Sequence, residues 1–161
     1  MQQSNTFSQL RIIHIAVLIS MVMFNVVALV LMLQGLTGLA DESFQRTLQV
    51  VCILLSAFFI IFGFKVFKKK IFAARNSLES GEKRLELYRS ACIMWWAMIE
   101  GPGIIAGIGF IISGNYAFFA LAILHLLILL AFTPRKANII LFLNLSSEEL
   151  GRLEGGKDNK K

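Results

Sequence analysis

Four long apolar runs, separated by short polar or charged segments, dominate the chain. They cover residues 12–33, 48–66, 91–112 and 116–132. Each run approaches the roughly 20 residues that cross a hydrocarbon core about 30 Å thick as an α-helix. Lipid offers the backbone no hydrogen-bond partners, and runs this continuous lack the alternating polarity of barrel strands. The pattern predicts an all-α membrane protein, a single domain over 1–161 with four transmembrane helices in two antiparallel hairpins.

Composition supports a membrane protein and narrows the function. The chain is 57% hydrophobic with a mean hydropathy of +0.71, more than a soluble core of 161 residues can bury, so we expect the lipid bilayer as a partner. The first run exceeds the ~7–15 apolar residues of a signal peptide and should remain in the mature protein. Soluble-enzyme motifs are absent from the sequence, and Cys52 and Cys92 lack metal-site spacing. We therefore expect no enzyme, no metal and no cofactor.

Basic residues predict the orientation. All 16 Lys and Arg except Arg46 lie near the N-terminus, in or beside the loop 67–90, or in the tail 134–161. Because cations at helix ends resist translocation, both termini, this loop and the tail should be cytoplasmic. Apolar residues at helical spacing within the loop predict that the second and third helices extend out of the membrane. Orientation and anionic lipid account for the net charge of +6, so nucleic acid is not an expected partner.

The C-terminal segment is expected to pack at the cytoplasmic surface. Pro134 ends the fourth run, and the following apolar run 139–145 is too short to cross a bilayer. We interpret it as an amphipathic interfacial segment or a lid under the bundle. Ser146 and Glu149 have the spacing of a capping box that opens a short helix. The residues 155–161 have the composition of a solvated, disordered tail.

Glu100 is the candidate functional residue, because it lies in the centre of the third run with no other charge between Arg89 and Arg135. A charge at mid-bilayer costs about 3 kcal/mol on insertion scales, so such a carboxyl group is protonated, paired or facing water. Two interpretations stay open. Glu100 is either a hydrogen-bonded acid that fixes helix register or a group that binds and releases protons.

Depth along straight helices identifies candidate partners of Glu100. At about 1.5 Å per residue from the inner face, Glu100 lies ~16 Å deep, Asn25 ~20 Å, Ser56 ~15 Å and His125 ~12 Å. Since the third and fourth helices should form a tight hairpin, we predict that His125 contacts Glu100 directly or through water. The alternatives are a neutral His125 bonded to a nearby carbonyl, and ordinary interhelical bonds for Asn25 and Ser56. His14 is expected at the interface.

The sequence after Glu100 predicts a kink and a packing face. Pro102 removes a backbone donor and clashes with the preceding turn, as in the discontinuous helices of ion-coupled transporters. Gly103 and Gly107 form a small-x-x-x-small pair, which favours close approach of another helix. That helix could belong to this chain or to a second protomer.

The C-terminal half resembles a group of uncharacterised small four-helix bacterial inner-membrane proteins. The residues that carry the resemblance are Arg89-x-Ala91, Trp96-Ala97-x-x-Glu100-Gly101, Gly114-Asn115 and Pro134. It implies an inner-membrane location and supplies no activity.

Glu100 in its glycine-containing helix is also similar to the acid-bearing helix of rotary ATPase proteolipid subunits, a resemblance that implies a proton-carrying role. The chain departs from that pattern, because the acid is on the first helix of its hairpin, Pro102 intervenes and the first hairpin lacks a dense glycine repeat. We therefore expect a structural or accessory subunit of a membrane complex or homo-oligomer. The alternative is a proton- or cation-handling transport unit that uses Glu100, with His125 tuning it.

Overall fold

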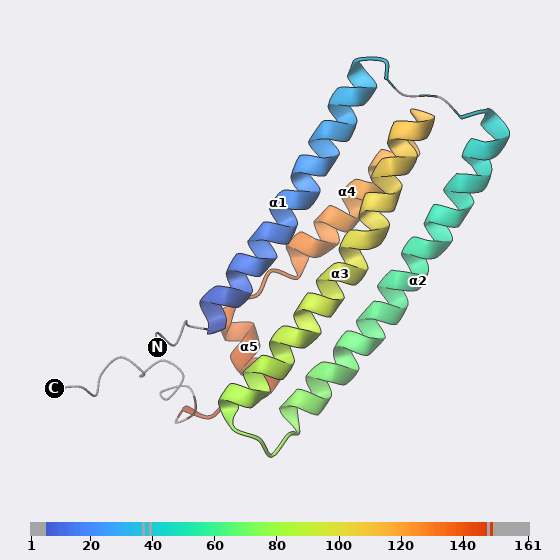
Figure 1. The fold of residues 1–161 in the computed structure, drawn as a ribbon. Helices are drawn as coiled ribbons and strands as arrows, with labels where there is room; N and C mark the ends of the chain where they lie inside the picture. The colour runs from blue at the N-terminus through green and yellow to red at the C-terminus, as the bar shows by residue number, and fades with distance from the viewer. Residues whose placement is uncertain (1–5, 37, 39, 148, 150–161) are drawn as a thin grey trace.

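The structure of the protein, a computed structural model, describes residues 6–36, 38, 40–147 and 149. These residues form five helices and no strand (Figure 1). The helices are α1 (Thr6–Leu33), α2 (Glu42–Arg75), α3 (Gly81–Ser113), α4 (Tyr116–Ala131) and α5 (Lys136–Leu143). The all-α prediction is confirmed for this part of the chain. The tail 155–161 lies outside the described residues.

Most of the predicted loop 67–90 is helical. With 34 and 33 residues, α2 and α3 are each about 50 Å long and leave only residues 76–80 between them. Asp41 caps α2 by accepting a hydrogen bond from the Phe44 amide, and Ser80 caps α3 by accepting one from the Lys83 amide. Both helices therefore continue beyond their apolar runs, as the helical spacing in the loop predicted.

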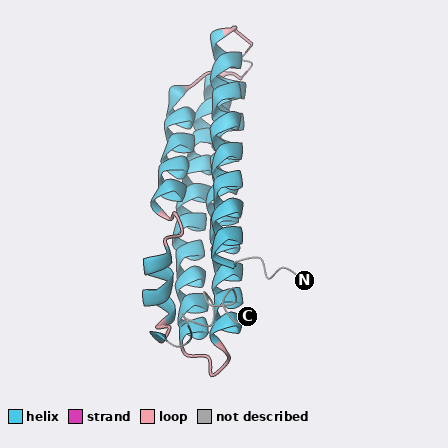
Figure 2. Ribbon diagram, turned by 90° about the vertical axis from the view of Figure 1, so that its left-hand side faces the viewer, coloured by secondary structure: helices cyan, strands magenta, loops and turns pink. Residues whose placement is uncertain are grey.

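Three of these helices, α1, α2 and α3, are long and apolar enough to cross a membrane. The fourth predicted span is less regular. The helix α4 has 16 residues, about 24 Å, and it meets the same criterion only together with α5, from which it is bent by 73°. Figure 2 shows this break between the two helices.

The centre of the bundle is α3, which packs against α1, α2 and α4 (Figure 1). Half of its most apolar stretch is buried, against 17% for α1 and 22% for α2. The consecutive helices α1 and α2 run antiparallel but have little mutual contact, and α1 packs in parallel along α3. Small residues of α3 explain this position, since they let neighbouring helices approach closely on several sides.

One end of the bundle collects the start of α1, the turn between α2 and α3, and α5 (Figure 1). The buried residues Ile139, Leu143 and Leu145 join the same core cluster as residues of α1, α2 and α3. This packing agrees with the lid interpretation of the run 139–145. Every described Lys and Arg except Arg46 lies toward this end, so the bundle has one strongly basic end.

The buried Arg84 of α3 connects the end of α2 with the segment after α5. Arg84 is 7% exposed and donates to the carbonyls of Ala74 and Arg75 at the end of α2, at 3.3 and 3.4 Å. It also pairs with Glu149 at 3.2 Å. The predicted capping box is confirmed, because Glu149 accepts from the Ser146 amide at 2.9 Å and the Ser146 hydroxyl accepts from the Glu149 amide at 3.2 Å. The Ser146 amide also holds the pKa of Glu149 below its usual range.

Candidate functional site

Glu100 lies at the edge between α1 and α3, where its partner is Ser20. The Ser20 hydroxyl donates to the carboxyl group of Glu100 at 2.7 Å, and it is also 3.2 Å from the Val17 carbonyl. Glu100 is half-buried and Ser20 is exposed, so the pair faces outward rather than into the core. Sequence reasoning missed Ser20, although at about 12 Å from the inner face it lies close to the expected depth of Glu100.

The predicted direct bond between Glu100 and His125 is not formed. The His125 Nδ1 lies 2.8 Å from the Leu121 carbonyl, one turn earlier in α4, and its Cβ packs against Gly103. Because a carbonyl can only accept, Nδ1 donates this bond, and in the neutral ring Nε2 would then be an acceptor. Nε2 is buried and has no partner among the described residues. The alternative of a neutral, carbonyl-bonded His125 agrees with this geometry, and a water bridge to Glu100 stays a prediction.

The other predicted polar residues stay separate from Glu100. Asn25 is buried and donates to the Met21 carbonyl of its own helix at 2.8 Å, which leaves its Oδ1 without a partner. Ser56 is also buried, and its hydroxyl has no described partner. The interhelical bonds expected for these two residues are therefore not formed by the described residues.

His14 is buried in the core rather than exposed at an interface. It is 1% exposed, its Nε2 donates to the Leu129 carbonyl at 3.0 Å, and its ring meets Trp96 edge-on at 4.8 Å between centroids. One side chain of α1 thus binds α4 and packs on α3. Its position early in the apolar run gave no sign of this, because hydropathy reports depth and not the direction in which a side chain points.

The glycine face of α3 is used within the chain. A Cβ added at Gly103 would lie 2.6 Å from the Met21 Cε and 3.0 Å from the His125 Cβ. One added at Gly107 would meet the Phe24 ring. Pro102 is buried inside α3, which runs through it as one helix. Both glycines therefore allow close approach of helices from the same chain, one of the two alternatives that the sequence left open.

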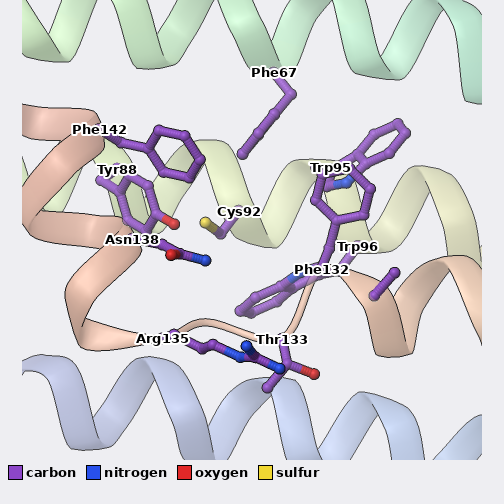
Figure 3. Close-up of a pocket in the computed structure, with 11 residues that line it drawn as sticks. Phe67, Tyr88, Cys92, Trp95, Trp96, Phe132, Thr133, Arg135, Asn138 and Phe142 are labelled. Carbon is purple, nitrogen blue, oxygen red and sulfur yellow. The ribbon is translucent and has the colours of Figure 1, made fainter.

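A cavity of about 150 Å³ lies at the break between α4 and α5 (Figure 3). The sequence analysis did not predict this cavity. The sequence features that could have indicated it are Pro134, which ends the fourth apolar run, and the adjacent pairs Trp95-Trp96 and Arg135-Lys136. Aromatic side chains form much of its wall, and the Tyr88 hydroxyl, the Cys92 thiol and the Asn138 amide point into it. The residues that line it are Phe67, Tyr88, Cys92, Trp95, Trp96, Ala131, Phe132, Thr133, Arg135, Asn138 and Phe142.

Comparison of the chain with protein-family models, curated protein sequences and solved structures gives no match. Among the described residues, no group of three or more His, Cys, Asp or Glu could hold a metal ion. The two candidate functional sites are therefore the edge between α1 and α3 that carries Glu100 and Ser20, and the cavity at the α4–α5 break.

Proposed function

We propose that the protein crosses a bacterial inner membrane four times, with α4 and its bend into α5 making the last crossing and both termini in the cytoplasm. In this membrane it acts as a non-enzymatic structural or accessory subunit of a complex or homo-oligomer. The apolar lengths of α1, α2 and α3 and the concentration of Lys and Arg at one end support this orientation.

The observation that carries the subunit role is the outward-facing pair of Glu100 and Ser20. Both lie within the apolar lengths of their helices, where lipid would surround any exposed side chain. A charged carboxylate that lipid can reach at that depth is costly, about 3 kcal/mol on insertion scales. A helix from another subunit that covers the pair would remove most of this cost, which gives the complex a driving force at this edge.

The surroundings of the pair favour a helix as the covering group. Exposed Ala16 lies one turn before Ser20 on α1, and exposed Ala97 lies one turn before the open Gly101 on α3. A Cβ at Gly101 would meet no other atom within 4 Å. Small residues beside a polar group allow another helix to approach closely and to form an interhelical hydrogen bond.

Replacing Gly101 by tryptophan should break the assembly and leave the bundle folded. A Cβ at this position meets no other atom of the chain within 4 Å, and the bulky ring would block the surface on which the partner helix packs. We expect the complex seen on native gels of mildly solubilised membranes to shift to the mass of the single chain. Leu124→Trp, at a 46% exposed position of α4, is the matched control and should assemble normally. A wild-type protein that migrates as a single chain, or a Gly101→Trp complex of unchanged size, would overturn the proposal.

A second candidate function is proton or cation handling by Glu100. The unpartnered Nε2 of His125 supports it, because this acceptor is buried beside Gly103, three residues from Glu100 on α3. Transport predicts a flux in reconstituted vesicles that Glu100→Gln abolishes and Cys52→Ala leaves unchanged. A wild-type protein without flux, or a Glu100→Gln variant with full flux, would rule this candidate out.

A further inference from the structure

We propose that the cavity at the α4–α5 break and the adjoining groove between α2 and α4 bind one anionic glycerophospholipid. The phosphate would occupy the cavity and one acyl chain would lie in the groove. This site is separate from the Glu100 edge, since Glu100 lines neither of these two spaces.

Polar side chains from the α4–α5 break supply the donors of the cavity wall. Arg135 lines the cavity with a guanidinium group, which carries five N–H donors. The Asn138 side chain points into the same space and adds an amide that can donate (Figure 3). The indole N–H groups of Trp95 and Trp96 are enclosed by other atoms, so these residues contribute their ring surfaces to the wall. The cavity thus offers donors at the α4–α5 break and suits a ligand that carries acceptors.

The charge in the wall selects an anion. Arg135 is the one charged residue that lines the cavity, and no carboxylate is among the lining residues. Its exposed side chain forms no ion pair with the described residues. A guanidinium group can donate two parallel hydrogen bonds to a phosphate, which makes Arg135 the expected anchor. The cavity, of about 150 Å³, has room for a phosphate group.

A second, apolar space lies beside the cavity. It has a volume of about 380 Å³ and shares Trp95 and Phe132 with the cavity. Its remaining lining residues are Ile60, Ile61, Phe64, Lys65 and Ile128. This groove is apolar and open, which suits a hydrocarbon chain, and Lys65 can extend its ammonium group toward a phosphate. A charged cavity next to an apolar groove matches an amphiphile better than a free ion.

The cavity and the groove lie where the headgroup of a membrane lipid is expected. They lie toward the basic end of the bundle, where α5 turns away from α4 (Figure 1). Anionic headgroups concentrate near clusters of Lys and Arg at the membrane surface. The acyl chain would then extend from this surface along α2 and α4 toward the bilayer centre.

Tryptophan fluorescence tests the proposal directly, because Trp95 and Trp96 are the only two tryptophans of the chain and both line the cavity. The full-length protein is titrated in micelles with phosphatidylglycerol or phosphatidylcholine, each carrying bromine on its acyl chains as a quencher. We expect phosphatidylglycerol to reach half-maximal quenching at about one-tenth of the mole fraction of phosphatidylcholine. Arg135→Gln should remove this preference, and Lys69→Gln, an exposed cation of α2 outside both spaces, should retain it.

Three results would overturn the lipid assignment. Equal quenching by the two lipids, or an unchanged preference in Arg135→Gln, would show that the cavity does not select an anion. Inorganic phosphate that reverses the quenching at millimolar concentration would identify a site for the free ion instead. Brominated stearate that quenches as well as phosphatidylglycerol would assign the site to fatty-acid carboxylates.

Discussion

Gly103→Leu should unfold the bundle more readily than any substitution at an exposed position. The first added atom would lie 3.0 Å from the His125 Cβ, which is fixed to the backbone of α4, and 2.6 Å from the Met21 Cε. The methionine end can move, but α4 must shift as a whole, and leucine adds three further carbons to the same gap. Overpacking of this kind costs about 1–3 kcal/mol or more. We expect a clear fall in the thermal unfolding temperature in detergent, with much less protein recovered from membranes.

Gly101→Leu is the matched control, because it lies two residues away on α3 and its Cβ would meet nothing within 4 Å. Any cost of placing leucine in this part of α3 is shared by both variants. If the two variants had equal unfolding temperatures, the packing of α1 and α4 onto the glycine face would be wrong.

His14→Ala should be the most damaging single change in α1, with a loss of about 3 kcal/mol in the free energy of unfolding. It removes a buried ring packed on Trp96, and it leaves the Leu129 carbonyl without this hydrogen bond between helices. His14→Phe keeps a ring but not the donor, so it should recover part of the loss. Ile12→Ala, at a 63% exposed position two residues earlier in α1, should change stability by less than about 1 kcal/mol.

Chemical or thermal unfolding of the four proteins in one detergent measures these differences. The ranking wild type, Ile12→Ala, His14→Phe, His14→Ala in decreasing stability is the expected result. His14→Ala with wild-type stability would place the imidazole outside the core and would contradict the position of α1 against α3 and α4.

Hydropathy predicted the existence of the helices well but their ends poorly. The apolar runs report which residues lipid can surround, whereas α2 and α3 continue through charged residues that also form helix. Lys68, Lys69 and Lys70 illustrate this difference, since they end the apolar run without ending α2. The helix stops only near Asn76, whose backbone amide closes the last turn on Phe72.

Depth arithmetic did not predict the direction of the candidate side chains. It placed Glu100, Asn25, Ser56 and His125 at similar depths, but it could not tell which neighbouring helix each side chain faces. Pairing Glu100 with His125 assumed that residues at similar depth on the two helices of a tight hairpin face each other. The structure instead places α1 beside α3, so that Ser20 meets Glu100 while His125 turns toward Gly103. The direction in which a side chain points around its helix axis depends on how all the helices pack together. The hydropathy pattern of one sequence does not determine this packing.

The arrangement across the membrane is the claim on which both proposals depend. It requires the turn between α2 and α3 to lie on the same side as the start of α5, and the connection between α3 and α4 on the opposite side. Labelling of single cysteines in intact cells tests this most directly. The background carries Cys52→Ala and Cys92→Ala, and the three reporters are Glu79→Cys, Asn115→Cys and Lys136→Cys.

A membrane-impermeant maleimide should label Asn115→Cys in intact cells, and it should reach Glu79→Cys and Lys136→Cys only after the membrane is opened. Labelling of Lys136→Cys together with Asn115→Cys in intact cells would show that α4 does not cross. Equal labelling of all three before the membrane is opened would contradict a membrane-spanning bundle altogether.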